Sequence, residues 1–315
     1  MSKRIIWSAI LIAVISCGNQ SSRSMPHVDD LNLVDFDGTI EDYTLGYDLT
    51  APNKRLKLSK KLEEISGLSL SRDGQYLVAV EDENGKIYIL DKKTGEIQED
   101  FNFWKPGDYE GVEVVGSDIY VLKSSGTIYR VTQAGKKDQA VEKFNGFLDS
   151  DNDVEGLAYD PIKHRLLLAC KAKAGKGEAF QGKKSIYAFD LNTLTLQPEP
   201  AFVISIADIH AYLDTAPAIR KLNKLAEMFQ PGTELTFAPS AVAIHPITGD
   251  IHILSSVGKV LMVINSSGQL QHIEKLRKEV HNQPEGLCFD QDGTLYIANE
   301  GKGGRGEVLI FNYSN

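Results

Sequence analysis

A short phrase returns five times along this chain, and it limits the fold more than any other feature. Each copy has Glu or Ser, then Gly or Ala, then an apolar run; the copies begin at Ser66-Gly67, Glu110-Gly111, Glu155-Gly156, Ser240-Ala241 and Glu285-Gly286. They lie 44 or 45 residues apart, except for one gap of 85, which is one period plus an insert. A repeat of this length built from short strands is typical of a β-propeller blade. Five copies therefore predict five blades.

The segments around each phrase support this interpretation. Turn signals such as Asp73-Gly74 and Thr248-Gly249 separate runs rich in β-branched and aromatic residues, as in β-hairpins. A more polar fourth run in the first four units suits an outer edge strand. The last unit holds three runs before Asn315, and the segment 43–58 can supply its fourth. We therefore expect an all-β, five-bladed propeller over residues 43–315, closed by an N-terminal strand.

The insert falls between units three and four, at about residues 204–233. Apolar residues from Ala218 to Phe229 recur at helical spacing, with a start signal at Asp214 or Thr215 and a stop at Pro231-Gly232. This predicts an amphipathic helix that packs on the propeller, with a lid or partner-docking helix as the alternative.

The N-terminus reads as a targeting segment. A positive start at Lys3-Arg4 precedes an apolar run, Ile5 to Ile15, that is shorter than the ~20 residues needed to span a bilayer. The run ends Val14-Ile15-Ser16-Cys17, which looks like a bacterial lipobox. We expect a signal peptide at 1–16, lipidation of Cys17 and a tether within 17–42, which would place the protein in the bacterial cell envelope, on a membrane. The alternative is an ordinary secretory signal with a chance cysteine.

Charge and the remaining cysteines exclude other classes. The net charge is −9 and no basic stripe appears, which disfavours nucleic acid as a partner. Cys170 and Cys288 fall in blades that are not adjacent, so a disulfide is not expected, and both should be buried free thiols.

The second position of the phrase is the best candidate site. The innermost strand of each blade lines the channel, so Glu110, Glu155 and Glu285 should converge near one mouth, with Ser66 and Ser240 completing the ring. The small residue that follows allows close approach of the backbones. Carboxylates in such a ring must bind a cation, share protons or pair with bases. Their oxygens suit a hard cation, most plausibly Ca²⁺.

A second ring leaves an alternative open. Lys123 and Lys171 end second strands at positions held elsewhere by Glu81, Ser255 and Glu300 or their near neighbours, so a salt-bridge network could replace the metal. The acidic run Asp149 to Asp153 resembles a calcium loop, but Val154 stands where an EF-hand requires Gly. A solvated acidic turn is favoured, although Asp153 could reach a metal held by Glu155.

Several phrases together resemble one protein family. They are Glu64-Ile-Ser-Gly-Leu68, Asn152-Asp-Val-Glu-Gly-Leu157, Leu166 to Lys171, Pro239 to Pro246 and Gln283-Pro-Glu-Gly-Leu287. This set is similar to the SdiA-regulated family of bacterial propellers. The resemblance implies a five-bladed, exported or lipid-anchored propeller without assigned activity. Ser66 and Ser240 depart from Glu, so a fivefold carboxylate ring is not implied.

Two classes of function remain. The first is a non-catalytic binding propeller that holds a cation in its channel and presents a mouth to a small-molecule or protein ligand. The second is a metal-dependent hydrolase of the lactonase, esterase or phytase type. The sequence contains no motif of nucleophilic catalysis and no His at a repeated channel position, which favours the first class and names no catalytic residue.

Overall fold

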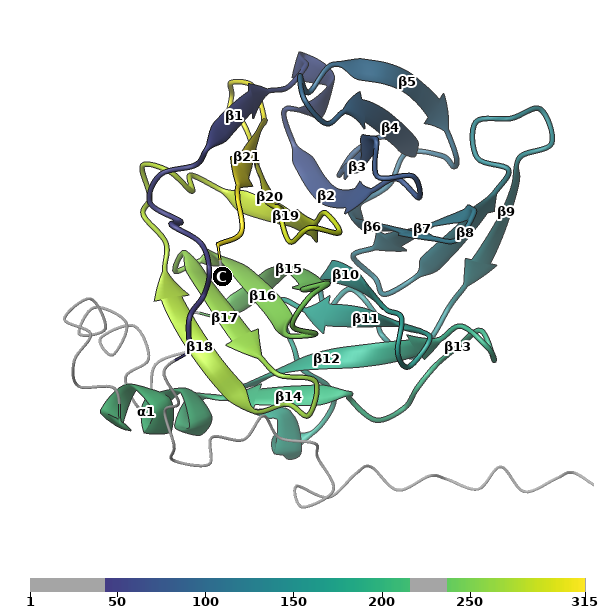
Figure 1. Ribbon diagram of the computed structural model, residues 1–315. Helices are drawn as coiled ribbons and strands as arrows, with labels where there is room; N and C mark the ends of the chain where they lie inside the picture. Colours follow the sequence, from purple (N-terminus) through teal and green to yellow (C-terminus); the bar gives the residue numbers. More distant parts are fainter. Residues whose placement is uncertain (1–42, 216–236, 315) are drawn as a thin grey trace, which may run out of the picture.

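Five antiparallel sheets stand around a common axis in the computed structural model, which describes residues 43–215 and 237–314 (Figure 1). Blade 1 consists of β2 (Ile65–Leu70), β3 (Tyr76–Glu81), β4 (Lys86–Asp91) and β5 (Ile97–Asn102). Blade 2 consists of β6 (Tyr109–Val115), β7 (Asp118–Lys123), β8 (Ile128–Thr132) and β9 (Ala140–Phe144). Each blade runs from the axis outward in chain order, as the repeat predicts.

The inner three strands of the other three blades follow the same plan, whereas the outer strands of blades 3 and 5 differ. Blade 3 consists of β10 (Val154–Asp160), β11 (Arg165–Cys170), β12 (Lys183–Asp190), β13 (Thr195–Leu196) and β14 (Phe202–Ser205). Blade 4 consists of β15 (Ala238–Ile244), β16 (Ile251–Val257), β17 (Val260–Ile264) and β18 (Leu270–Lys275). Blade 5 consists of β19 (Pro284–Phe289), β20 (Leu295–Asn299), β21 (Glu307–Phe311) and β1 (Lys54–Lys57). Two short 3-10 helices lie at Lys60–Leu62 and Glu178–Phe180.

The N-terminal strand closes the ring, which confirms the prediction. β1 pairs antiparallel with β21, with Leu56 opposite Val308. Leu56 and Leu58 are buried while Arg55 and Lys57 are exposed, so the alternation of the segment matches an outer strand with one covered face. The pairing ties the first and last described strands together and gives blade 5 a fourth, outer strand.

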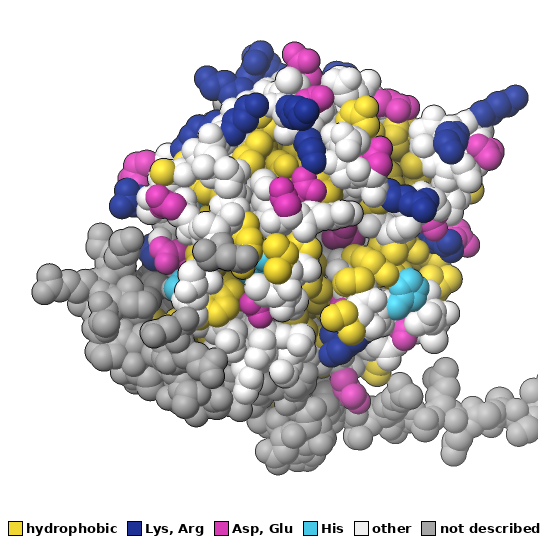
Figure 2. All heavy atoms as spheres, in the orientation of Figure 1, with side chains coloured by type: hydrophobic (Ala, Val, Ile, Leu, Met, Phe, Trp, Pro, Cys, Tyr) yellow, Lys and Arg dark blue, Asp and Glu magenta, His cyan; other side chains and the backbone are white. Residues whose placement is uncertain are grey.

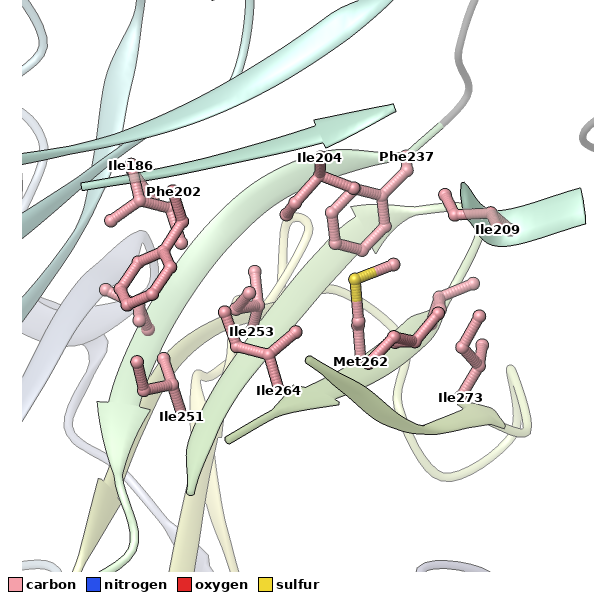
Figure 3. Close-up of a cluster of buried hydrophobic side chains, with 14 of the residues drawn as sticks. Ile186, Phe202, Ile204, Ile209, Phe237, Ile251, Ile253, Met262, Ile264 and Ile273 are labelled. Atoms are coloured by element: carbon pink, nitrogen blue, oxygen red, sulfur yellow. The ribbon is translucent and has the colours of Figure 1, made fainter. Parts of the chain in front are cut away.

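Apolar side chains between neighbouring blades form the core. In the cluster between blades 3 and 4, Ile186 and Phe202 face Ile251 and Ile264, and Ile209 of the helix covers one end (Figure 3). Burial of a side chain of this size contributes roughly 1.5–3 kcal/mol relative to exposure.

Blade 3 departs from the plan because its outer strand is split. β13 and β14 both pair with β12, and the segment between them contains Pro198 and Pro200, which cannot donate hydrogen bonds to a sheet. The helix α1 (Ile206–Thr215) follows at once. Ser205 and Asp208 form a capping box at its start: the Asp208 N–H donates to Ser205 Oγ, and the Ser205 N–H donates to Asp208 Oδ2.

The insert therefore contains a helix, but α1 begins earlier than the helix that we predicted from the sequence. We expected the start near Asp214, which belongs to the last turn of α1. The apolar residues from Ala218 to Phe229 lie outside the described residues, as do the predicted signal peptide, Cys17 and the tether. Within the described residues, none of the helices has the length and apolar character that crossing a membrane requires.

Candidate functional site: the two mouths of the channel

Each innermost strand carries a β-bulge at the predicted ring residue. In blade 2, Tyr109 pairs with Lys123 and Gly111 with Leu122, so Glu110 has no partner across the sheet. The same register shift occurs at Ser66, Glu155, Ser240 and Glu285. A bulge re-aims a side chain, here at the end of the channel where the innermost strands begin. We call this end the entry mouth, and the opposite end, where these strands turn back into the second strands, the hairpin mouth.

The small residue after each bulge lets the blades approach closely, as predicted. A Cβ on Gly67 would lie 2.8 Å from the Val112 N atom, and one on Gly111 would lie 2.7 Å from the Leu157 Cβ atom. The space left between the five strands at this level is about 10 Å³, which is room for about one water molecule. The entry mouth is therefore closed by packing.

The two serines of the ring join neighbouring blades. The Ser66 hydroxyl donates to the Tyr109 carbonyl at 2.6 Å, and the Ser240 hydroxyl donates to the Pro284 carbonyl at 2.9 Å. Both acceptors stand one residue before the bulge of the next blade. The hydroxyls thus act as interblade links rather than as free groups in the channel.

The three ring glutamates lie together around one lysine. This arrangement does not decide whether a metal ion binds here. Glu155 and Glu285 are buried, and the Lys171 ammonium donates to Glu155 Oε1. Burial and the nearby Glu155 raise the pKa of Glu110 to about 10, and burial and Glu285 raise that of Glu155 to about 8, although Lys171 opposes the second shift. Burial also raises the pKa of Glu285.

Lys171 keeps its charge in this setting. Burial disfavours its ammonium, but the attraction of Glu155, Glu285 and Asp153 outweighs burial, so its pKa is raised. A positive charge that faces several carboxyls stabilises one carboxylate and favours protonation of the others. These contacts are compatible with a proton-sharing salt-bridge network, the alternative to a bound cation.

The second ring joins this network only in part. Burial and Glu285 raise the pKa of Glu300 to about 7. Glu81 instead accepts hydrogen bonds from the Glu83 and Asn84 N–H groups. Lys123 makes no ion pair within the described residues, so the two lysines singled out from the sequence differ in role.

Two contributors to the entry mouth were missed. Asp108 forms a side-chain hydrogen bond with Glu110 and another with Ser124. Lys259 donates to the Ser256 carbonyl at 2.8 Å, and its charge opposes the rise in the pKa of Glu285 that burial causes. Asp108 stands two residues before a ring position, and Lys259 stands at the start of the third run of its unit; both positions can be located in the sequence, but neither residue type recurs there in every unit.

The acidic run before Glu155 is a turn held by lysines. Asp151 pairs with Lys173 at 2.7 Å and Asp149 with Lys176 at 3.2 Å. The Asp153 carbonyl accepts a hydrogen bond from the Lys171 N–H at 2.8 Å. These contacts agree with the acidic-turn interpretation and place Asp153 beside Lys171.

The ring has the chemistry for a hard cation but not an open geometry. Carboxyl and hydroxyl oxygens are suitable ligands, and Glu155 Oε2 is buried without a hydrogen-bond partner among the described residues. Lys171, however, already supplies the positive charge. Across residues 43–215 and 237–314, no three or more His, Cys, Asp or Glu side chains are grouped in a way that could hold a metal ion.

The hairpin mouth contrasts with this closed end, because it opens into a pocket of about 850 Å³. Its walls include Leu70, Val114, Ile244, Leu287 and Phe289. Figure 2 shows hydrophobic side chains gathered around the middle of the face on which the C-terminal end lies (compare Figure 1). Cys288 lines this pocket as a buried free thiol whose pKa is raised by burial, and Cys170 is also free and buried, as expected.

Two acids line this pocket, Asp160, which is paired with Arg165, and Glu113, which makes no ion pair within the described residues and was not predicted from the sequence. Glu113 Oε1 accepts hydrogen bonds from Ser69 Oγ at 2.7 Å and from the Val114 N–H at 3.1 Å. Glu113 Oε2 accepts only the Tyr159 N–H, at 3.3 Å. Burial raises the pKa of Glu113 to about 7, although these hydrogen bonds oppose the shift. Glu113 stands three residues after Glu110, where the other copies have Ser69, Ala158, Ala243 and Cys288.

Comparison with known proteins agrees with the fold. The model of the SdiA-regulated family matches residues 43–185 and 224–302, which is most of the chain. The protein belongs to the SdiA-regulated family. No curated protein matches this family member.

Solved structures similar to this family member share its fold at low sequence identity. Glutaminyl cyclase from Myxococcus xanthus has 10% identity and a TM-score of 0.53, with 84% of this chain and 97% of that chain covered. A gluconolactonase from Xanthomonas campestris has 15% identity and a TM-score of 0.46, with 78% and 72% covered. A nidogen/laminin complex has 13% identity and a TM-score of 0.45, with 75% and 72% covered. At these identities the likeness concerns architecture alone.

Proposed function

We propose that this family member is a non-catalytic binding propeller of the bacterial cell envelope, which takes up a ligand at its hairpin mouth. The observation that carries the proposal is the pocket of about 850 Å³, which has apolar walls, the Asp160–Arg165 ion pair and the carboxyl of Glu113. Ligand sites commonly have this size and this combination of apolar lining and few polar groups. The ring at the entry mouth is then a support that fixes the blades.

Binding of a neutral apolar dye tests this proposal. Nile red should bind to the chain that lacks residues 1–17 and fluoresce there. This shortened chain is suitable because the ring is closed within the described residues. Ala243→Leu, which adds bulk inside the pocket, should reduce binding at least tenfold. Ile162→Asp changes a rim residue that is 83% exposed and should weaken binding without affecting folding. Undiminished binding in both variants would refute the pocket as the ligand site.

A cation at the entry mouth is a second element of the proposal, supported by the buried, unpartnered Glu155 Oε2. Because Lys171 competes for the same carboxylates, Ca²⁺ should raise the melting temperature modestly in the parent chain and more in Lys171→Met. Glu155→Gln should abolish the effect. If Ca²⁺, Mg²⁺ and Zn²⁺ leave all three melting temperatures unchanged, the cation has no role.

The envelope location and the alternative activity have their own tests. Cys17→Ser should release the protein from the membrane fraction if Cys17 carries the lipid. The metal-dependent hydrolase stays a prediction. Lactone, ester and phosphate hydrolysis measured with and without Ca²⁺ tests it, and turnover that is lost in Glu155→Gln would favour it over a binding role.

A further inference from the structure

We propose that the hairpin-mouth pocket binds a small amphipathic organic anion, with its apolar body against the pocket walls and its acid group at Arg72 and Lys163. The inference rests on the proposed function and adds the chemical class of the ligand. A volume of about 850 Å³ lies within the range of roughly 300–1,000 Å³ found for small-molecule sites.

The charges of the rim favour an anionic head group. Arg165 donates to Asp160 at 2.9 Å, so these two charges neutralise one another. Arg72, in the β2–β3 turn, and Lys163, in the β10–β11 turn, are exposed and make no ion pair within the described residues. Both line the pocket from different blades. An acid group seated between them gains charge-assisted hydrogen bonds at little desolvation cost.

The apolar wall continues outward from the pocket to the surface. Ile162 is 83% exposed in the β10–β11 turn, and Ile247 is 54% exposed in the β15–β16 turn. Large apolar side chains in this position extend the surface that a hydrocarbon body can cover. The combination of apolar walls and rim cations matches a molecule with one long apolar part and one acid group.

Glu113 adds a polar contact inside the pocket and a dependence on pH. Its Oε1 atom has two donors and its Oε2 atom only one long contact, so the proton of the neutral acid belongs on Oε2. A neutral Glu113 can donate to a polar group of the ligand, whereas an ionised Glu113 repels an anion. Because burial raises its pKa to about 7, anion binding should weaken between about pH 6 and pH 8.5.

Other titratable groups face the same pocket. Cys288 on β19 and His245 on the β15–β16 turn have pKa values that burial shifts away from neutrality, upward for the thiol and downward for the imidazole. Tyr159 on β10, hydrogen-bonded to His164, and the charges of Arg72, Asp160, Lys163 and Arg165 complete the set. Glu113→Gln keeps all of these and removes only the carboxyl titration.

The N-terminal end of the described chain lies at this same mouth. The Tyr43 hydroxyl donates to Asp250 Oδ2 at 3.1 Å in the β15–β16 turn, and the Tyr47 hydroxyl donates to the Gly293 carbonyl at 2.6 Å in the β19–β20 turn. If Cys17 carries the predicted lipid, the tether would reach the propeller at the hairpin mouth. Amphipathic anions derived from membrane lipids would then be close to the pocket.

The test is displacement of bound Nile red by three ten-carbon compounds that differ in head group: decanoate, decanol and decyltrimethylammonium. Decanoate should displace the dye at a concentration at least tenfold below that of decyltrimethylammonium. The charge reversals Arg72→Glu and Lys163→Glu together should remove this preference, since two exposed charge contacts of ~1 kcal/mol each correspond to roughly ten- to thirtyfold. Lys105→Glu is the matched control, because Lys105 is an exposed lysine on the entry side.

The outcomes separate this inference from the proposed function. If decanoate and decyltrimethylammonium displace Nile red equally, or the reversals change nothing, the anion preference is wrong while the pocket remains a binding site. If Nile red itself binds independently of Ala243→Leu and Ile162→Asp, both fail. Weakening of decanoate binding from pH 6 to pH 8.5 in the parent chain, and its absence in Glu113→Gln, would support the role of Glu113; the same pH profile in both chains would refute it.

Discussion

The two mouths of this channel are made by the same five strands, yet one is closed and polar and the other is open and apolar. At the entry mouth the repeated bulges bring the backbones together until about 10 Å³ remains. At the hairpin mouth, residues from these same strands and their turns surround about 850 Å³. The repeated position of the phrase is thus a packing device. The position three residues later, where Glu113 stands among Ser, Ala and Cys, breaks the repeat and lies in the wall of the open pocket.

Substitution of glycine at the two ends of one strand should show the largest difference between the mouths. Gly111→Ala places a methyl group 2.7 Å from the Leu157 Cβ atom and should lower the free energy of unfolding by about 3 kcal/mol. Gly116→Ala, near the hairpin mouth, meets no atom within 4 Å and costs only its positive φ, about 1 kcal/mol. Urea denaturation measures both values, and equal losses would contradict the contrast in packing.

Removal of the central lysine should be the next largest effect. Lys171→Met leaves Glu155 buried without its partner and should lower the free energy of unfolding at pH 7 by about 2 kcal/mol. This loss is smaller than that expected on breaking a fully ionised buried pair, because Glu155 can take up a proton. The double variant Lys171→Met/Glu155→Gln should recover most of this loss. Failure of the double variant to recover would mean that Lys171 acts through packing rather than charge.

The pH dependence of stability should distinguish the acids of the two mouths. The folded-state pKa of Glu110, about 10, lies above that of an unfolded carboxyl, about 4.3, so the folded protein holds a proton that the unfolded chain releases. The contribution of Glu110 to stability is therefore fully present at low pH and is lost as pH rises toward 10, by about 1 kcal/mol per pH unit. Glu113 should add to this fall in stability only up to about pH 7, its pKa in the folded protein.

Glu110→Gln checks this sign directly. It should flatten the fall above pH 7 and make the protein more stable than the parent at pH 8, in thermal or urea unfolding followed across pH. Glu113→Gln should affect the slope only below about pH 7. A Glu110→Gln variant that is less stable than the parent at pH 8 would mean that the carboxylate is ionised and bound there, as a cation site requires.

The smallest expected effect concerns a single hydrogen bond at the hairpin mouth. Ser69→Ala removes the hydroxyl that stabilises the Glu113 carboxylate and should move the pKa of Glu113 from about 7 to about 8. Carbon-detected NMR titration of labelled Glu side chains measures this shift. Ser66→Ala, which removes an interblade bond at the entry mouth, serves as the control and should leave the pKa of Glu113 unchanged.

Much of the fold followed from the sequence because the signals are local and repeated. The period placed all five blades, and the missing fourth run of the last unit pointed to the segment 43–58 as the closing strand. The helix predicted over Ala218 to Phe229 lies outside the described residues, whereas α1, which begins with the capping box of Ser205 and Asp208, was not predicted. The split outer strand of blade 3 could also have been read from Pro198 and Pro200.

Only part of the candidate site was predicted from the sequence. The sequence identified the ring glutamates and Lys171 because they recur at equivalent positions. It could not show that the Lys171 ammonium reaches Glu155 while Lys123 reaches no acid of the described ring, since that depends on side-chain paths between blades. Glu113 was missed because a residue that departs from a repeat cannot be told from chance variation until its position in the fold is known.

The sequence by itself determined the number of blades, their order, the closing strand and which residue of each blade faces the entry mouth, because hydrophobic period and turn chemistry act within one blade. Only the tertiary structure decided which mouth is closed and which is open. That outcome depends on how five bulges converge on one axis, how burial shifts the charges of Glu110 and Glu155, and how turns from separate blades enclose Glu113. These are distances between segments that lie 40 or more residues apart, and no local pattern encodes them.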